Sequence, residues 1–196
     1  MIKNERQREI ISILKSEGFC SVNNLCDKLF ASKASIRRDL TELENQGIVK
    51  RSYGGAELIS SSTSVVPFYA RAYNYADKKQ IIAKKAATLI SEGSVIFLDQ
   101  SSTSLFVARE ILEKKNITVV TNNLEIINTL ADSNISVICS GGELSVDNRA
   151  CFVGTSACET FEGIYADIMF FSTKSLTVSG VMTDCTQREV FVRNSM

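Results

Sequence analysis

Continuous apolar runs of strand length alternate with helical patterns over residues 95–171. The apolar runs fall at residues 95–98, 117–120, 135–139 and 168–171, and the helical patterns between them fall at residues 105–114, 124–130 and 155–161. Strands that are apolar on both faces are typical of parallel sheets covered by helices on both sides. The sequence therefore predicts an α/β domain, whose ligands bind at the carboxyl ends of the strands.

A helix predicted at residues 77–92 precedes the first of these strands, and Gly93 ends it. Its apolar residues are expected to face the core: Ile81, Ile82, Ala86, Leu89 and Ile90.

The N-terminal part of the chain has the order helix, short helix, tight turn, longer helix. Residues 5–17 have an apolar stripe of Ile10, Ile11 and Leu14, and Ser21 is placed to cap a short second helix. Ser32 is placed to cap the third helix. This order predicts a helix-turn-helix, in which the third helix enters the major groove of DNA.

The third helix separates apolar from polar residues. Ile36, Leu40 and Leu43 share the core-facing stripe, whereas small, hydroxyl and basic side chains occupy the other faces. Arginine forks can bond guanine edges or phosphates. The residues predicted to contact DNA from this helix and its cap are Ser32, Lys33, Ser35, Arg37, Arg38 and Thr41. The alternative is a solvated face that happens to carry two arginines.

A basic pair and a double glycine follow the third helix. Ile48 and Val49 precede Lys50 and Arg51, and Gly54-Gly55 come shortly after. This pattern predicts a small β wing, from which Lys50 and Arg51 contact phosphates flanking the groove. The alternative is a basic turn without function.

A serine-rich stretch marks the predicted domain boundary. Residues 60, 61, 62 and 64 are serines and the only proline, Pro67, follows them. Such a composition is typical of a flexible connector. We therefore predict a DNA-binding domain at residues 1–57, a linker at 58–75 and a second domain at 76–196.

Polar residues and glycines follow the first three predicted strands of the second domain. Hydroxyl side chains before a helix bring backbone N–H groups and the positive end of the helix dipole together, which favours an anion. Amides can bond sugar hydroxyls or phosphate oxygens. The residues in question are Asp99, Ser101, Ser102, Thr103 and Ser104 after the first strand, Asn122 and Asn123 after the second, and Gly141 and Gly142 after the third. Taken singly, the hydroxyl and amide residues are equally typical of helix caps.

Composition excludes several classes of protein. The net charge is zero, so DNA binding must come from a local basic patch. Histidine is absent, which removes the commonest general base and the commonest zinc ligand. No signal peptide and no apolar run of membrane-spanning length occur, and six cysteines form no C-x-x-C pair. We therefore expect a cytoplasmic chain with reduced cysteines, no membrane association, no metal and no cofactor.

Three motifs resemble those of DeoR-type bacterial transcription regulators. They are Ser35-Ile36-Arg37-Arg38-Asp39-Leu40, Leu43-Glu44-Asn45-Gln46-Gly47, and Arg51-Ser52-Tyr53-Gly54-Gly55-Ala56. The strand ends resemble the sensor domain of the same family. The resemblance implies a winged helix-turn-helix, to which Tyr53 adds a contact to the DNA backbone. It also implies an α/β sensor domain similar in fold to ribose-5-phosphate isomerase, which binds a phosphorylated sugar and to which Lys79 and Lys174 contribute.

The chain departs from the family pattern at three places that matter for the effector, one of them near Lys174-Ser175-Leu176, where the family usually shows a glycine turn. Ser101 stands where the phosphate loop of the family usually carries a glycine. The family's sensor domain also continues with a further strand beyond the helix that starts near Gln187, so the resemblance implies a sensor that is short at its C-terminus.

The leading hypothesis is a transcriptional regulator of carbohydrate-metabolism genes. It would act as a repressor, bind a double-stranded operator as a homodimer or homotetramer, and respond to a small phosphorylated sugar. One alternative is a constitutive DNA binder with a non-functional, shortened sensor. Another is a sugar-phosphate isomerase or hydrolase fused to a DNA-binding unit, although none of the available carboxylates has a second catalytic group spaced with it: Asp99, Glu143, Asp167 and Asp184.

Overall fold

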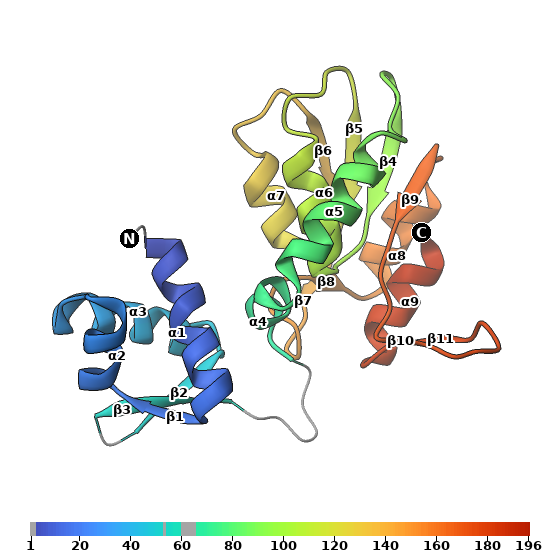
Figure 1. Cartoon of the computed structure of the whole chain (residues 1–196). Coiled ribbons are helices and arrows are strands. Elements are labelled where there is room, and N and C mark those ends of the chain that lie inside the picture. Colours follow the sequence, from blue (N-terminus) through green and yellow to red (C-terminus); the bar gives the residue numbers. More distant parts are fainter. Residues whose placement is uncertain (1–2, 53, 60–65) are drawn as a thin grey trace. The chain divides into compact units, whose positions relative to one another are not determined.

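The computed structural model describes residues 3–52, 54–59 and 66–196, which fall into two compact units (Figure 1). These units comprise Met1–Asn74 and Tyr75–Met196. None of the helices among the described residues is long and apolar enough to cross a membrane.

The first unit is a winged helix-turn-helix. Its helices are α1 (Lys3–Glu17), α2 (Val22–Leu29), α3 (Lys33–Asn45) and α4 (Phe68–Tyr73). Its strands are β1 (Phe19–Ser21), β2 (Val49–Ser52) and β3 (Gly55–Leu58), which form an antiparallel sheet in the order β1-β3-β2. The predicted three helices and the wing are therefore present, and β1 completes the wing sheet from the other side.

Side-chain caps and one apolar core explain why these residues form this unit. Ser21 Oγ accepts a hydrogen bond from the N–H of Asn24, and Ser32 Oγ accepts one from the N–H of Ser35, so both helices begin where the sequence predicts. The stripe residues predicted for α1 and α3 are buried together with Leu25 of α2: Ile10, Leu14, Ile36, Leu40 and Leu43. Gly55 allows β1 to approach, because a Cβ at this position would lie 2.5 Å from the carbonyl oxygen of Cys20.

The segment predicted as a linker contains a helix. α4 packs against the core of the first unit through Tyr69, Ala70 and Tyr73, and only Asn74 and Tyr75 separate it from the first helix of the second unit. The predicted serine-rich connector lies at residues 60–65, outside the described residues. Burial of aromatic side chains holds the second half of the segment to the first unit.

The second unit is built on a parallel four-stranded sheet. The strands are β4 (Val95–Leu98), β5 (Thr118–Thr121), β6 (Ser136–Cys139) and β9 (Ile168–Phe170), in the order β6-β5-β4-β9. Strand β4 pairs in parallel with both β5 and β9. The four strands are the four apolar runs of the sequence, so the prediction of a parallel α/β sheet is confirmed.

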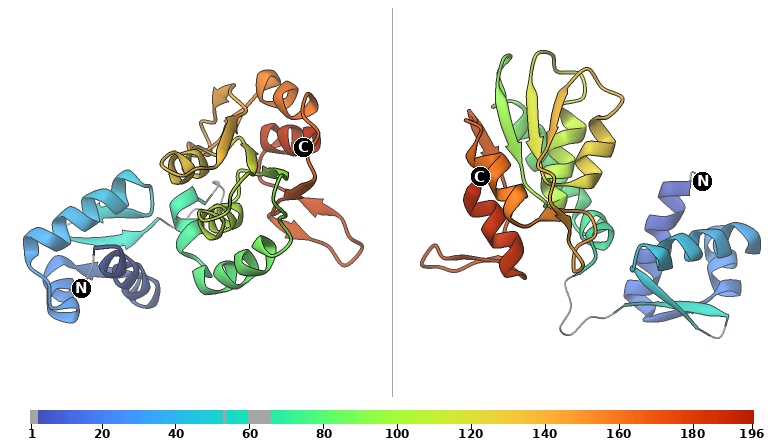
Figure 2. Two further views of the ribbon diagram at one scale, coloured as in Figure 1. Left: turned by 90° about the horizontal axis from the view of Figure 1, so that it is seen from above. Right: turned by 180° about the vertical axis from the view of Figure 1, so that it is seen from behind.

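Helices cover both faces of this sheet (Figure 2). One side holds α5 (Ala76–Ala87), α6 (Ser102–Glu110) and α7 (Leu124–Leu130), and the other holds α8 (Thr155–Glu162) and α9 (Gln187–Ser195). Phe97 and Val120 of the sheet pack with Phe161 of α8 and Val192 of α9. Two short antiparallel pairs complete the unit: β7 (Glu143–Leu144) with β8 (Phe152–Val153), and β10 (Ser175–Leu176) with β11 (Met182–Thr183).

The predicted core face of the helix before β4 is partly wrong. Ala86 and Ile90 are buried as expected, but Ile81, Ile82 and Leu89 are 69%, 53% and 58% exposed. α5 packs closely against α6 and buries Ala83 and Ala86 instead. Small side chains allow the two helices to approach, so the core face consists of alanines rather than of the largest apolar residues.

Candidate nucleic-acid interface and effector site

The outer face of α3 presents basic side chains. Lys33, Arg37, Arg38 and Thr41 are exposed, whereas Ile36 on the opposite side is fully buried. The predicted division of this helix into a core face and a solvent face is therefore present. A helix with exposed arginine forks on its first two turns has the chemistry that base edges and phosphates require.

The two predicted serines organise the start of α3. Ser32 Oγ accepts from the Ser35 N–H at 3.2 Å, and the two hydroxyl oxygens lie 3.0 Å apart. Ser32 therefore acts as the helix cap of α3, and its hydroxyl is engaged within the protein.

The wing carries the other residues that are predicted to contact DNA. Lys50 is exposed on β2, and Arg51 lies on the same strand with its guanidinium turned toward α3. Tyr53, the third predicted wing residue, lies outside the described residues. Lys33, Arg37 and Arg51 line an open groove of about 700 Å³ between the N-terminal ends of α2 and α3 and the wing.

A buried ion pair fixes α3 to α1. Arg6 Nε lies 2.5 Å from Asp39 Oδ2, and Arg6 Nη2 lies 3.3 Å from Asp39 Oδ1. The hydrogen bond to Asp39 raises the pKa of Arg6 above its ordinary value. The sequence alone does not predict this pair, because the two residues are far apart in the chain and each has the pattern of an ordinary charged helix residue.

A second polar connection joins the same two helices near the surface. Glu42 of α3 accepts hydrogen bonds from Lys3 Nζ at 2.6 Å and from Gln7 Nε2 at 2.7 Å. These bonds lower the pKa of Glu42 below its ordinary value. Together the two connections hold the helix that carries the exposed basic residues in one orientation on its support.

Asp99 is the buried centre of the strand-end site in the second unit. Its Oδ1 accepts from the Ser101 N–H at 3.0 Å and from Ser104 Oγ at 2.7 Å. Its Oδ2 accepts from the Ser172 N–H at 3.1 Å and lies 3.4 Å from Arg193 of α9. Both carboxylate oxygens are therefore engaged within the protein, so Asp99 organises the loop from beneath.

The loop after Asp99 forms the N-terminus of α6. Ser101 Oγ accepts from the Ser104 N–H at 3.0 Å and so caps the helix, and Asn123 Nδ2 reaches the Ser101 carbonyl oxygen at 3.5 Å. Ser102 is buried and Thr103 is half-buried in the first turn. Ser101 has φ −77° and ψ 153°, which is extended backbone open to any residue, so the serine at this family glycine position causes no strain.

The end of β5 lies beside this loop, and the end of β6 follows on the far side of β5. Asn122 Nδ2 donates to the Phe152 carbonyl oxygen at 2.9 Å, and Asn123 Oδ1 accepts from the Glu125 N–H and caps α7. Gly141 and Gly142 follow β6 with positive φ values of 65° and 100°. A Cβ at Gly142 would lie 2.6 Å from the Val153 carbonyl oxygen, so only glycine fits there.

Two buried amide side chains at these strand ends, and a third in the loop between β7 and β8, carry unpaired polar atoms. Within the described part of the chain, Gln100 Oε1, Asn122 Oδ1, and both amide atoms of Asn148 have no hydrogen-bond partner. A buried polar atom without a partner is unfavourable and needs an explanation. Asn148 was not among the predicted residues, because it lies in an irregular loop between β7 and β8 that has no sequence signature.

The two predicted lysines come from other elements of the second unit. Lys79 is half-buried in the first turn of α5, and Lys174 is exposed where its backbone N–H donates to Thr183 at the base of the β10–β11 hairpin. The bonded group itself comprises Asp99, Ser101, Ser104 and Asn123.

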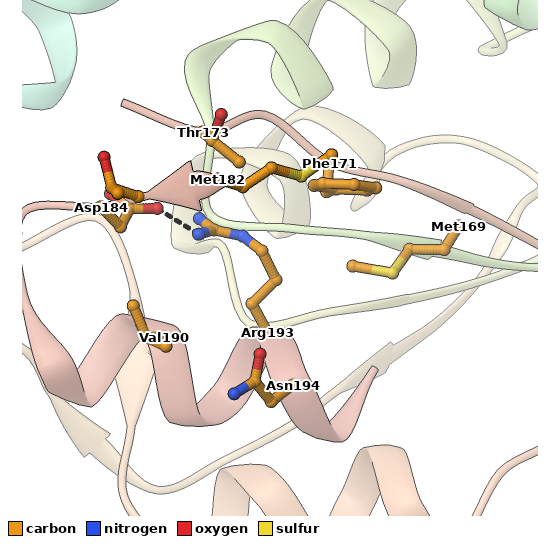
Figure 3. Close-up of a pocket in the computed structure, with 9 residues that line it drawn as sticks. Met169, Phe171, Thr173, Met182, Asp184, Val190, Arg193 and Asn194 are labelled. Atoms are coloured by element: carbon orange, nitrogen blue, oxygen red, sulfur yellow. Dashed lines mark hydrogen bonds and ion pairs between the residues drawn. The ribbon is translucent and has the colours of Figure 1, made fainter. Parts of the chain in front are cut away.

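Arg193 connects the strand-end site to a separate pocket of about 260 Å³ (Figure 3). The guanidinium bonds Asp184 on one side and lies next to Asp99 on the other. Met169, Phe171 and Met182 form much of the pocket wall. Arg193, which lies next to Asp99, therefore also lines this pocket.

Comparison with known proteins agrees with the architecture of both units. Residues 6–62 match the DeoR-like helix-turn-helix domain, and residues 74–196 match the DeoR C-terminal sensor domain. The chain belongs to the DeoR family of transcriptional regulators.

Several curated DeoR relatives are similar over most of the chain. The HTH-type transcriptional regulator GolR of Listeria innocua is 37% identical over 185 residues, which cover 94% of this chain and 72% of GolR. The GlpR regulator of Haloferax volcanii is 32% identical over 196 residues, which cover 100% of this chain and 76% of the relative. The glycerol-3-phosphate regulon repressor of Escherichia coli is 38% identical over 145 residues, which cover 74% of this chain and 57% of the repressor.

Membership of the DeoR family makes this chain a DNA-binding transcriptional regulator and not an enzyme. The four carboxylates considered for an isomerase have structural partners. Asp99 and Asp184 bond Arg193, Glu143 lies 2.5 Å from Arg188 Nη2, and Asp167 Oδ2 accepts from the Val95 N–H at 2.8 Å.

Replacing Arg38 by alanine is expected to weaken binding to the operator by about 1–3 kcal/mol if the guanidinium bonds a base edge. The measurement is a binding titration on an operator selected from a random DNA pool, with Arg8→Ala on the exposed surface of α1 as the matched control. An equal loss on random DNA would assign Arg38 to the phosphates.

Proposed function

We propose that this DeoR-family chain is a cytoplasmic repressor of carbohydrate-metabolism genes whose operator binding is relieved by a small phosphorylated sugar. The operator would be read by Arg37, Arg38 and neighbouring side chains of α3, and Lys33, Lys50 and Arg51 would contact the backbone. The effector would bind at the carboxyl ends of β4, β5 and β6.

The unpaired amide atoms at those strand ends and in the β7–β8 loop are the observation that carries the effector proposal. Gln100, Asn122 and Asn148 are buried and their free atoms are mostly carbonyl oxygens, which accept bonds from hydroxyl groups. A polyhydroxylated ligand would satisfy them. The cost of leaving such atoms buried without partners would then be offset whenever the sugar is bound.

The N-terminus of α6 is suited to the phosphate of the same ligand. Ser102 and Thr103 lie in its first turn, where backbone N–H groups and the helix dipole favour a negative charge. Lys79 at the start of the preceding helix would supply a cation. The name of the E. coli relative, a glycerol-3-phosphate regulon repressor, supports both repression and a phosphorylated small molecule.

Binding as a homodimer or homotetramer is part of this proposal. A single helix-turn-helix unit contacts one half-site, and regulators of this type bind repeated half-sites as symmetric assemblies. A constitutive DNA binder with a non-functional sensor is the alternative, and the effector titration below distinguishes the two.

The proposal predicts that one member of a panel of phosphorylated sugars lowers operator affinity by about 5- to 150-fold, the usual range of coupling between two sites. The panel is titrated against the full chain bound to the selected operator, and each unphosphorylated sugar serves as the control for its phosphate ester. Operator binding that no panel member changes would favour the constitutive binder.

A further inference from the structure

The guanidinium of Arg51 lies against the recognition helix instead of extending from the wing. Arg51 Nη1 donates to Thr41 Oγ1 at 2.9 Å and lies 3.7 Å from Glu44 Oε2. Thr41 and Glu44 are both exposed residues of α3, and Arg51 is on β2. The side chain therefore bridges the wing and the helix.

Thr41 holds Arg51 through one hydrogen bond, and Glu44 holds it through two contacts. Thr41 Oγ1 accepts from Arg51 and donates to the Arg37 carbonyl oxygen at 2.9 Å, so its hydroxyl is engaged within the protein. Glu44 Oε1 accepts from the backbone N–H of Arg51 at 3.0 Å, which ties the strand itself to α3. One carboxylate thus holds both the backbone and the side chain of Arg51.

Stability gives little reason for this arrangement. The Arg51 and Glu44 side chains are each 41% exposed, and ion pairs at such exposure contribute little to folding. Arg51, however, lines the same groove as Lys33 and Arg37. A guanidinium held at a fixed position loses less conformational freedom when it binds an anion.

We propose that Thr41 and Glu44 are positioning residues that hold Arg51 in the groove between α2, α3 and the wing, where its remaining N–H groups meet a phosphate of the DNA backbone. The inference rests on DNA binding by the winged helix-turn-helix. Thr41 then positions Arg51 instead of contacting a base. Glu44 also has a role, although its negative charge by itself would repel DNA.

The test measures binding of the full chain to a random-sequence DNA duplex as a function of salt. Glu44→Asp keeps the charge but shortens the side chain, and Thr41→Val keeps the shape but removes the hydroxyl. Each is expected to lower affinity by up to about fivefold near 0.15 M salt and to reduce the salt slope by up to about one, because one phosphate contact is weakened or lost.

The same substitutions in an Arg51→Ala background separate positioning from other effects. Arg51→Ala alone is expected to reduce the slope by about one, and adding Glu44→Asp or Thr41→Val is expected to change nothing further. Glu9→Asp on the exposed face of α1 is the matched control. Because the exchanged residues are exposed, all variants are expected to fold, which a thermal unfolding curve checks.

Two results would overturn the proposal: a wild-type salt slope in both Glu44→Asp and Thr41→Val, or a loss that persists in the Arg51→Ala background. An unchanged slope in Arg51→Ala itself would also overturn it. A slope near zero in the wild-type chain would instead contradict DNA binding as a whole, so the two failures are distinguishable.

Discussion

Replacing Arg6 by alanine is expected to lower the free energy of unfolding of the DNA-binding unit by about 3–5 kcal/mol. The Asp39 side chain is only 2% exposed and Arg6 16% exposed, so the substitution leaves a buried carboxylate without its partner. Such a loss is comparable to the whole stability of a small domain. The amides of α3 would exchange with solvent much faster, and hydrogen exchange at these amides measures the first unit separately from the sensor unit.

Two comparisons make this test specific to the ion pair. Arg8→Ala, an exposed arginine on the same helix, is expected to stay within about 0.5 kcal/mol of the wild type. Adding Asp39→Ala to Arg6→Ala is expected to recover part of the loss, because no unpaired charge remains buried. A loss in Arg6→Ala no larger than that in Arg8→Ala would contradict this account of how α3 is supported.

Replacing Asp99 by alanine is expected to destabilise the sensor unit by a similar amount, about 3–5 kcal/mol. The carboxylate is fully buried and accepts bonds from Ser101, Ser104 and Ser172 in addition to its contact with Arg193. Its removal leaves the loop before α6 without the carboxylate that accepts its hydrogen bonds. We expect faster hydrogen exchange at the amides of β4 and α6, with the DNA-binding unit unchanged.

The stability of the Asp99→Ala variant separates a supporting role from a direct contact with the effector. Asp132→Ala, an exposed aspartate of the same unit, is the matched control. Asp99→Asn keeps an acceptor for Ser104 but loses the ion pair with Arg193, so an intermediate effect is expected. An Asp99→Ala variant with wild-type stability that fails only to bind a sugar phosphate would show that Asp99 contacts the ligand.

Local patterns were sufficient to predict the elements that carry function. The α3 face follows from apolar residues at helical spacing, and its start follows from Ser32, whose cap bond the structure contains. The parallel sheet follows from four apolar runs separated by helices. Both predictions depend only on residues that are close together in the chain, so a single sequence is sufficient to make them.

Long-range pairs could not be predicted in this way. Asp39 appears in the sequence as a polar residue of a helix surface, and its burial depends on Arg6 of another helix. The sequence predicts Asp99 at the strand end, but its contact with Arg193 joins residues that are 94 positions apart in the chain. Burial of a charged residue depends on a partner that no local pattern identifies.

Side-chain size misled the prediction for α5. The apolar pattern places Ile81 and Leu89 in the core, yet the buried residues of α5 are Ala83 and Ala86. Close helix packing selects small residues. For Asn148 the sequence gives no signal, because an amide in an irregular loop acquires meaning only when folding buries it.

The most direct test of the proposed function is the affinity of the full chain for its selected operator with and without the most effective sugar phosphate of the panel. The account predicts a fall in affinity of about 5- to 150-fold in the wild type and in an exposed control, Asn134→Ala. It predicts that Asn122→Ala binds the operator normally but no longer responds. An undiminished response in a folded Asn122→Ala variant, or no response of the wild type to any phosphorylated sugar, would contradict it.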